Sequence, residues 1–113
     1  MSNVWENFLA ATVILASAGS VKQRLVDAYS AYLAAVNREE LPKEIREDFS
    51  HLSSCLCCVR PQRGESAVQA TVRKMSDLEA GRYASQIVSM LGILAKSQPS
   101  MRPVLRAVNS GDD

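Results

Sequence analysis

Residues 4–18 read VWENFLAATVILASA, and this stretch decides the fold. After Glu6 it contains no charged residue, and the next charge along the chain is Lys22. Most of its residues are good helix formers, so we expect a helix over about residues 2–18.

The apolar residues of this first helix are too many for one face. One stripe at helical spacing contains Trp5, Phe8, Leu9, Thr12 and Ala16. Ile14 and Leu15 fall outside that stripe. A helix that is apolar nearly all round is usually central to a bundle or covered by a second subunit. We therefore expect the other helices of this chain, or those of a second copy, to cover it.

The same stretch also resembles a cleavable secretory signal, because the apolar run 8–18 ends in Ala-Ser-Ala. The preceding residues, MSNVWEN, contain no lysine or arginine and do contain Glu6, whereas a signal normally begins with a positive region. The run is also too short to span a bilayer. We expect a buried helix that stays attached.

Two amphipathic helices are predicted next. Ser20 and Gln23 form the pattern of a capping box, which begins a second helix over about residues 20–37. One face of that helix contains Val21, Leu25, Ala28, Tyr32 and Val36. Pro42 suits the first turn of a third helix, since its missing amide hydrogen costs nothing there. The core stripe of this third helix is Ile45, Phe49, Leu52 and Leu56.

Sequence patterns in the second half of the chain predict a loop and two more helices. Residues 60–64, RPQRG, break the apolar pattern and indicate the loop. A Ser-x-x-Gln pattern at Ser66 begins a short helix, and a Ser-x-x-Glu pattern at Ser76 begins a long one over about residues 77–96. The stripe of the long helix is Ala80, Ala84, Ile87, Leu91 and Leu94.

These patterns together predict the fold class. The chain has 113 residues, 47% of them hydrophobic and 22% charged, which suits one domain with a core of its own. No run alternates apolar and polar residues over the length of a strand. We expect an all-α fold, a single compact bundle or orthogonal array of about five helices, over residues 1–98. Residues 99–113 are expected to form a weakly ordered tail.

The cysteines indicate the compartment. Cys55, Cys57 and Cys58 lie within four residues, too close together for a framework of loop-closing disulfides. A clustered, odd number of cysteines suits a reducing environment, so we expect a cytoplasmic protein.

His51, Cys55 and Cys58 form the most specific candidate site. Their spacing of i, i+4 and i+7 places them on one side of the predicted third helix, away from its core stripe. An imidazole and two thiolates could bind zinc, but a structural site needs a fourth ligand, and no second Cys or His pair exists in the chain. Small hydrophobic cysteines packed against a neighbour are the simpler interpretation.

A basic segment follows that site. The chain has five basic against seven acidic residues up to residue 59, and eight against five from there on. Five of these basic residues, Arg60, Arg63, Arg73, Lys74 and Arg82, could meet phosphates or an acidic partner if they shared one surface. Only Tyr83 could stack on a base nearby, so nucleic acid is not the favoured partner.

The sequence therefore favours a protein-interaction module that associates with itself and has no catalytic activity of its own. We expect Trp5, Phe8 and Ile14 to make the contact, and Arg60, Arg63 and Arg73 to select the partner. A nucleic-acid accessory protein acting through residues 60–82 is the alternative, and a metal or thiol site at His51, Cys55 and Cys58 is the third hypothesis. No cofactor and no membrane partner is implied.

Overall fold

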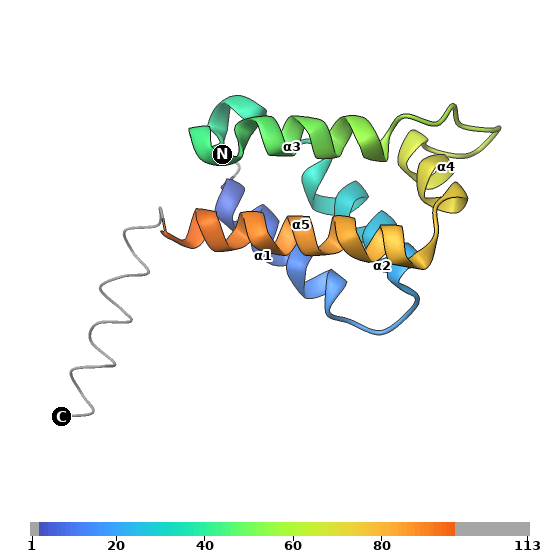
Figure 1. Ribbon diagram of the computed structural model, residues 1–113, viewed down its shortest axis with the longest axis horizontal. Helices are drawn as coiled ribbons and strands as arrows, with labels where there is room; N and C mark the ends of the chain where they lie inside the picture. Colours follow the sequence, from blue (N-terminus) through green and yellow to red (C-terminus); the bar gives the residue numbers. More distant parts are fainter. Residues whose placement is uncertain (1–2, 97–113) are drawn as a thin grey trace.

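The computed structural model describes residues 3–96 and shows only helices, turns and loops over that range (Figure 1). The predicted all-α class is confirmed. The α-helices are α1 (Val4–Leu15), α2 (Val21–Ala28), α3 (Lys43–Leu56), α4 (Ala67–Lys74) and α5 (Asp77–Lys96). A π-helical turn η1 (Tyr29–Leu33) extends α2, and a 3₁₀ turn η2 (Arg38–Glu40) precedes α3.

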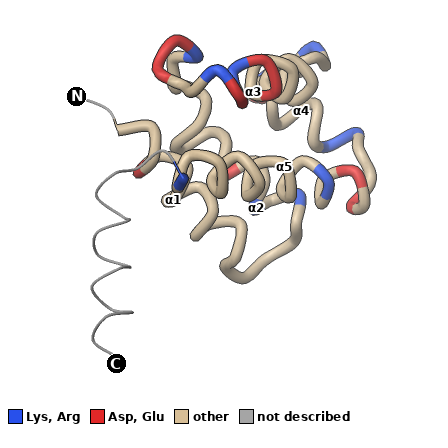
Figure 2. Tube along the Cα trace, turned by 60° about the vertical axis from the view of Figure 1, so that its left-hand side comes forward, with Lys and Arg blue, Asp and Glu red and all other residues tan. Residues whose placement is uncertain are grey.

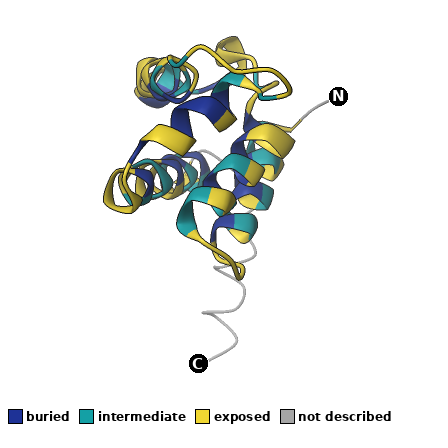
Figure 3. Ribbon diagram, turned by 90° about the vertical axis from the view of Figure 1, so that its right-hand side faces the viewer, coloured by how far each residue is buried: buried dark blue, intermediate teal, exposed yellow. Residues whose placement is uncertain are grey.

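Helices α1, α2 and α5 pack against one another and form the larger layer. Helix α3 lies over α5, and α4 contacts both α2 and α3, so that α4 closes one end of the molecule (Figure 1). The rings of Phe8 on α1 and Phe49 on α3 meet edge to face, with 5.7 Å between their centroids. One hydrophobic core therefore joins the two layers, and its buried residues line the interior between the helices (Figure 3).

Side-chain caps fix where the helices begin. The hydroxyl of Ser20 accepts a hydrogen bond from the amide of Gln23 at 3.1 Å. Ser66 and Gln69 form a complete capping box, in which each side chain bonds the backbone amide of the other. Gly19 has a φ of +110°, which an L side chain rarely adopts, so the turn between α1 and α2 requires a glycine there.

The core stripe of α3 is as predicted, since Ile45, Phe49, Leu52 and Leu56 are all buried. On α5, the structure buries Ala80, Ile87 and Leu94, leaves Ala84 and Leu91 half-buried, and adds Met90 to the core. Within residues 3–96, no helix combines the length and the apolarity needed to cross a bilayer. The predicted tail, residues 99–113, lies outside the described residues.

The second helix differs from its prediction, because it widens into the π turn. The amide of Ala34 donates to the carbonyl of Tyr29 at 2.8 Å, five residues back instead of four. The wider turn shifts the register of the following residues. Leu33 is therefore buried and Tyr32 is exposed, where a regular 3.6-residue period places Tyr32 in the core.

Candidate functional site

Helix α1 has apolar side chains on both its inner and its outer face. Phe8, Ala11 and Leu15 point into the core and are buried. On the opposite side, Leu9 is 42% exposed and Val13 is 63% exposed. We call these two residues, one helical turn apart, the outer face of α1.

The residues predicted to make the contact lie elsewhere on the helix. Phe8 is 0% exposed and belongs to the core, so its ring is not on the surface of this chain. Trp5 and Ile14 are partly buried and pack against the core from either flank. The sequence did contain a signal for Leu9, which falls on the predicted stripe, but periodicity alone could not tell which stripe faces inward.

Charges lie only at the two ends of this face. Glu6, in the first turn of α1, is exposed. At the other end, the guanidinium group of Arg24 on α2 donates hydrogen bonds to the carbonyls of Leu15 and Gly19. The connection between α1 and α2 has no charged residue (Figure 2).

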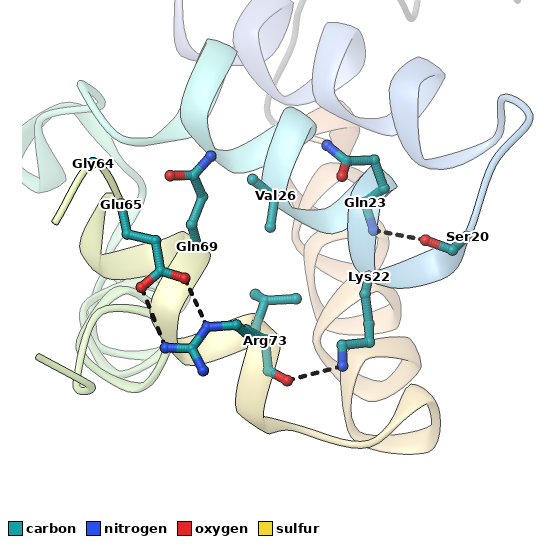
Figure 4. A pocket seen from close by; sticks show the side chains of 9 residues that line it. Ser20, Lys22, Gln23, Val26, Gly64, Glu65, Gln69 and Arg73 are labelled. Carbon is teal, nitrogen blue, oxygen red and sulfur yellow. Dashed lines mark hydrogen bonds and ion pairs between the residues drawn. The ribbon is translucent and has the colours of Figure 1, made fainter. Parts of the chain in front are cut away.

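The three arginines predicted to select a partner have different surroundings. Arg60 and Arg63 are exposed in the connection between α3 and α4. Arg73, on α4, forms a bidentate ion pair with Glu65, with Nε–Oε2 and Nη2–Oε1 distances of 2.7 and 3.2 Å (Figure 4). This pairing lowers the pKa of Glu65 below its ordinary value. The positive charge of Arg73 is thus largely compensated within the chain.

The ion pair borders a pocket of about 440 Å³ between the start of α2 and α4 (Figure 4). The ammonium group of Lys22 points into this region and donates to the carbonyl of Arg73 at 3.1 Å. Because Arg73, a member of the basic segment, is paired with Glu65, its own placement adds no support to the nucleic-acid hypothesis.

A second pocket brings together the predicted His and Cys residues. His51, Cys55 and Cys58 line a pocket of about 430 Å³ between α3, α4 and α5. The Cys55 sulfur lies 3.7 Å from Nε2 and 3.8 Å from Nδ1 of His51. His51 and Cys55 share one side of α3 as predicted, and Cys58, which lies past the end of the helix at Leu56, lines the same pocket. We call this cavity the thiol pocket.

Other helices supply residues of the thiol pocket that sequence reasoning did not find. Lys74 comes from α4, and Glu79 and Tyr83 come from α5. Burial raises the pKa of the Tyr83 hydroxyl, and the neighbouring thiol of Cys55 and the carboxylate of Glu79 raise it further. Only the packing of α5 beside α3 reveals this proximity, since no pattern in the sequence links the two segments.

Cys57 points away from the thiol pocket. Its thiol donates to the Tyr29 hydroxyl at 3.9 Å, on the side of α3 that faces the π turn. Burial raises the pKa of Tyr29, and the Ser53 hydroxyl partly offsets that increase. All three cysteines are free thiols.

The residues described do not form a metal centre. Within residues 3–96, no three His, Cys, Asp or Glu side chains converge closely enough to hold a metal ion. The zinc hypothesis for His51, Cys55 and Cys58 therefore gains no support from their placement. What their arrangement offers is thiol chemistry.

Comparison of this chain with protein families, with characterised proteins and with solved structures finds no match.

Proposed function

We propose that this chain is a protein-interaction module that associates with a second copy of itself through the outer face of α1. The observation that carries the proposal is the exposure of Leu9 and Val13, at 42% and 63%, on a helix that already buries its opposite face. Burial of apolar surface stabilises an association by about 25 cal/mol per Å² before the ordering costs.

A second copy is the occupant that the charges favour. A twofold antiparallel pairing centred between residues 9 and 13 puts Leu9 of one copy opposite Val13 of the other. In the same alignment, Glu6 lies opposite residue 16, beside the end of the other α1 where Arg24 binds the terminal carbonyls. A parallel pairing would instead bring the two Glu6 carboxylates together, which is unfavourable.

The size of the surface limits the affinity. A single helix face is smaller than the roughly 800 Å² per partner of a standard interface. We therefore expect a reversible dimer with a dissociation constant between about 1 µM and 1 mM. Such an association responds to local concentration, as expected of a module that assembles only where its copies gather.

Sedimentation velocity from about 1 µM to 1 mM tests the proposal. The wild-type chain should shift from monomer to dimer over this range. Val13→Glu should remain monomeric, because its dimer would bury an unpaired charge. Leu78→Glu is the matched control, since Leu78 is 70% exposed on α5 and is not part of the outer face of α1, so this variant should dimerise like the wild type. A wild-type chain that stays monomeric at every concentration overturns the proposal.

Glu6→Gln tests the orientation through the sign of its effect. In the antiparallel dimer it removes an attraction to Arg24 and should weaken dimerisation by about two- to fivefold. In a parallel dimer it would remove a repulsion and strengthen dimerisation instead. The dissociation constant thus distinguishes the two arrangements.

A further inference from the structure

The thiol pocket contains a pair of cysteines with dithiol spacing. Cys55 and Cys58 are separated by two residues and both line the cavity, whereas Cys57 between them contacts Tyr29 on another side. Cys55 is half-buried and Cys58 is exposed, so a small molecule in the pocket can reach both sulfurs. The fold thus selects two of the three neighbouring thiols.

His51 gives Cys55 a proton acceptor. The two side chains are one helical turn apart on α3, and the sulfur lies within 3.8 Å of both ring nitrogens. A neutral imidazole can take the thiol proton through the ring nitrogen that has no hydrogen, and both nitrogens are within reach, so either tautomer can generate the thiolate that attacks disulfides. His51 lies in the pocket wall and is exposed, so it can return the proton to a leaving group.

We propose that Cys55 and Cys58 form a thiol–disulfide exchange site for small zwitterionic disulfides of the amino-acid or short-peptide class. Lys74 and Glu79, on opposite sides of the α4–α5 connection, both line the pocket and offer one cation and one anion. Amino-acid and peptide disulfides have carboxylate and ammonium groups that complement this pair. A volume of about 430 Å³ is in the range that holds small ligands.

The exchange takes place in two balanced steps. In the first, the Cys55 thiolate attacks one sulfur of the disulfide, its S–S bond breaks, and His51 returns the proton to the released thiolate. In the second, the Cys58 thiolate attacks Cys55 in the mixed disulfide and expels the second small thiol, which takes up the proton of Cys58. The small disulfide is reduced to two thiols, and Cys55 and Cys58 are oxidised to one disulfide.

The end of α3 permits this closure. Neighbours at i and i+3 on a helix have Cβ atoms about 5–6 Å apart, more than the roughly 3.5–4.5 Å of a disulfide. The helix ends at Leu56, and the amide of Cys57 makes only a long 3.4 Å bond to Ser54. Cys58 can therefore approach Cys55 by a change confined to one turn, while the amide of Val59 stays bonded to Thr71 at 3.0 Å.

Two single-serine variants, Cys57→Ser and Cys58→Ser, test the pairing. Each full-length variant is incubated with oxidised glutathione, and its intact mass is followed with time. Cys57→Ser should lose two hydrogen atoms, because Cys55 and Cys58 close a disulfide. Cys58→Ser should stop at the glutathione adduct on Cys55. The proposal is overturned if Cys57→Ser stays reduced or stops at an adduct, or if Cys58→Ser closes a disulfide equally fast.

Two further variants, made in the Cys57→Ser background, test the roles of the pocket walls. His51→Gln should slow the first step by about tenfold or more at neutral pH, since it removes the proton acceptor. Lys74→Gln should slow the reaction with oxidised glutathione by about two- to fivefold and leave that with uncharged hydroxyethyl disulfide unchanged. Equal losses with both reagents would contradict the assigned ligand class. Because these readouts are covalent, they are independent of whether the chain dimerises.

Discussion

Helices α1 and α3 are similar in length and share the same core, but their outer faces differ in the kind of residue they expose. Outside its buried stripe, α3 presents charged residues such as Lys43, Glu44 and Glu47. The side of α1 opposite its core residues presents Leu9 and Val13. The contrast shows that apolar content alone does not identify a core helix. What distinguishes α1 is the apolar area that stays exposed after its inner face is buried, and the proposed association rests on that area.

The inner faces of the two helices should be equally important for folding. Phe8→Ala and Phe49→Ala should each lower the free energy of unfolding by about 3–5 kcal/mol, because each removes a buried ring from the edge-to-face pair. Urea unfolding followed by circular dichroism, at a concentration where the chain is monomeric, measures both. A loss below about 1 kcal/mol in Phe8→Ala would show that α1 does not belong to the core.

The ends of the two helices provide a smaller difference. Arg24 of α2 donates to the carbonyl of Leu15, the last residue of α1, and to that of Gly19 in the connection that follows. The last turn of α3 contains no basic residue. Arg24→Met keeps the aliphatic stem and should lower the free energy of unfolding by about 1 kcal/mol. Arg82→Met, at an exposed position of α5, is the control and should change it little. Equal effects of the two variants would remove any special role of Arg24.

The outer face of α1 should matter little to the folding of the monomer. Leu9→Ala should lower the free energy of unfolding by no more than about 1 kcal/mol, because Leu9 is 42% exposed and only part of its side chain is covered by the chain itself. Leu52→Ala on α3 should lower it by about 2–5 kcal/mol. If urea titrations at low protein concentration give equal losses for the two variants, Leu9 is covered within the monomer and the outer face of α1 does not differ from a core face.

The smallest expected effect on stability concerns the connection that follows α3. Glu65, after α3, has its pKa lowered by Arg73, so the unfolded chain binds a proton there more readily than the folded chain. The stabilisation by this pair is therefore complete above the ordinary pKa of glutamate and disappears as the pH falls through the lowered value.

Thermal unfolding measured at a series of pH values checks this linkage. Glu65→Gln should unfold at a slightly lower temperature than the wild type at pH 7 and at the same temperature in strong acid. A gap between wild type and Glu65→Gln that widens in acid would have the wrong sign for this ion pair.

The sequence predicts best where apolar and charged residues are separated. The buried stripe of α3 and the capping box at Ser66 are examples, since both depend on interactions within a few residues. In α1, apolar residues surround the helix, and the sequence could not indicate that Leu15 is buried and Leu9 exposed. Only the packing of α2 and α5 selects the inner face.

The candidate sites likewise combine features that local spacing predicts with features that only tertiary packing creates. The shared side of His51 and Cys55 follows from helical spacing alone, whereas Cys58 lies past the end of α3 and reaches the same pocket through the turn that follows the helix. The contribution of Tyr83 to the thiol pocket depends on a tertiary contact that no local pattern encodes. The pairing of Arg73 with Glu65 spans eight residues, from the position before the N-cap of α4 to the last turn of that helix, and no pattern in the sequence singled it out.

The π turn contains one residue more than an α-helical turn would need. Tyr29 and Leu33 are buried there, while Ser30 and Ala31 between them face the solvent. Deletion of Ala31 would reduce the separation between the amide of Ala34 and the carbonyl of Tyr29 from five residues to four, which is the hydrogen-bond spacing of an ordinary α-helix. The side chain of Leu33 would still face inward, because three- and four-residue separations share one side. A one-residue deletion, normally among the most disruptive edits to a helix, would here be absorbed by a return to regular winding.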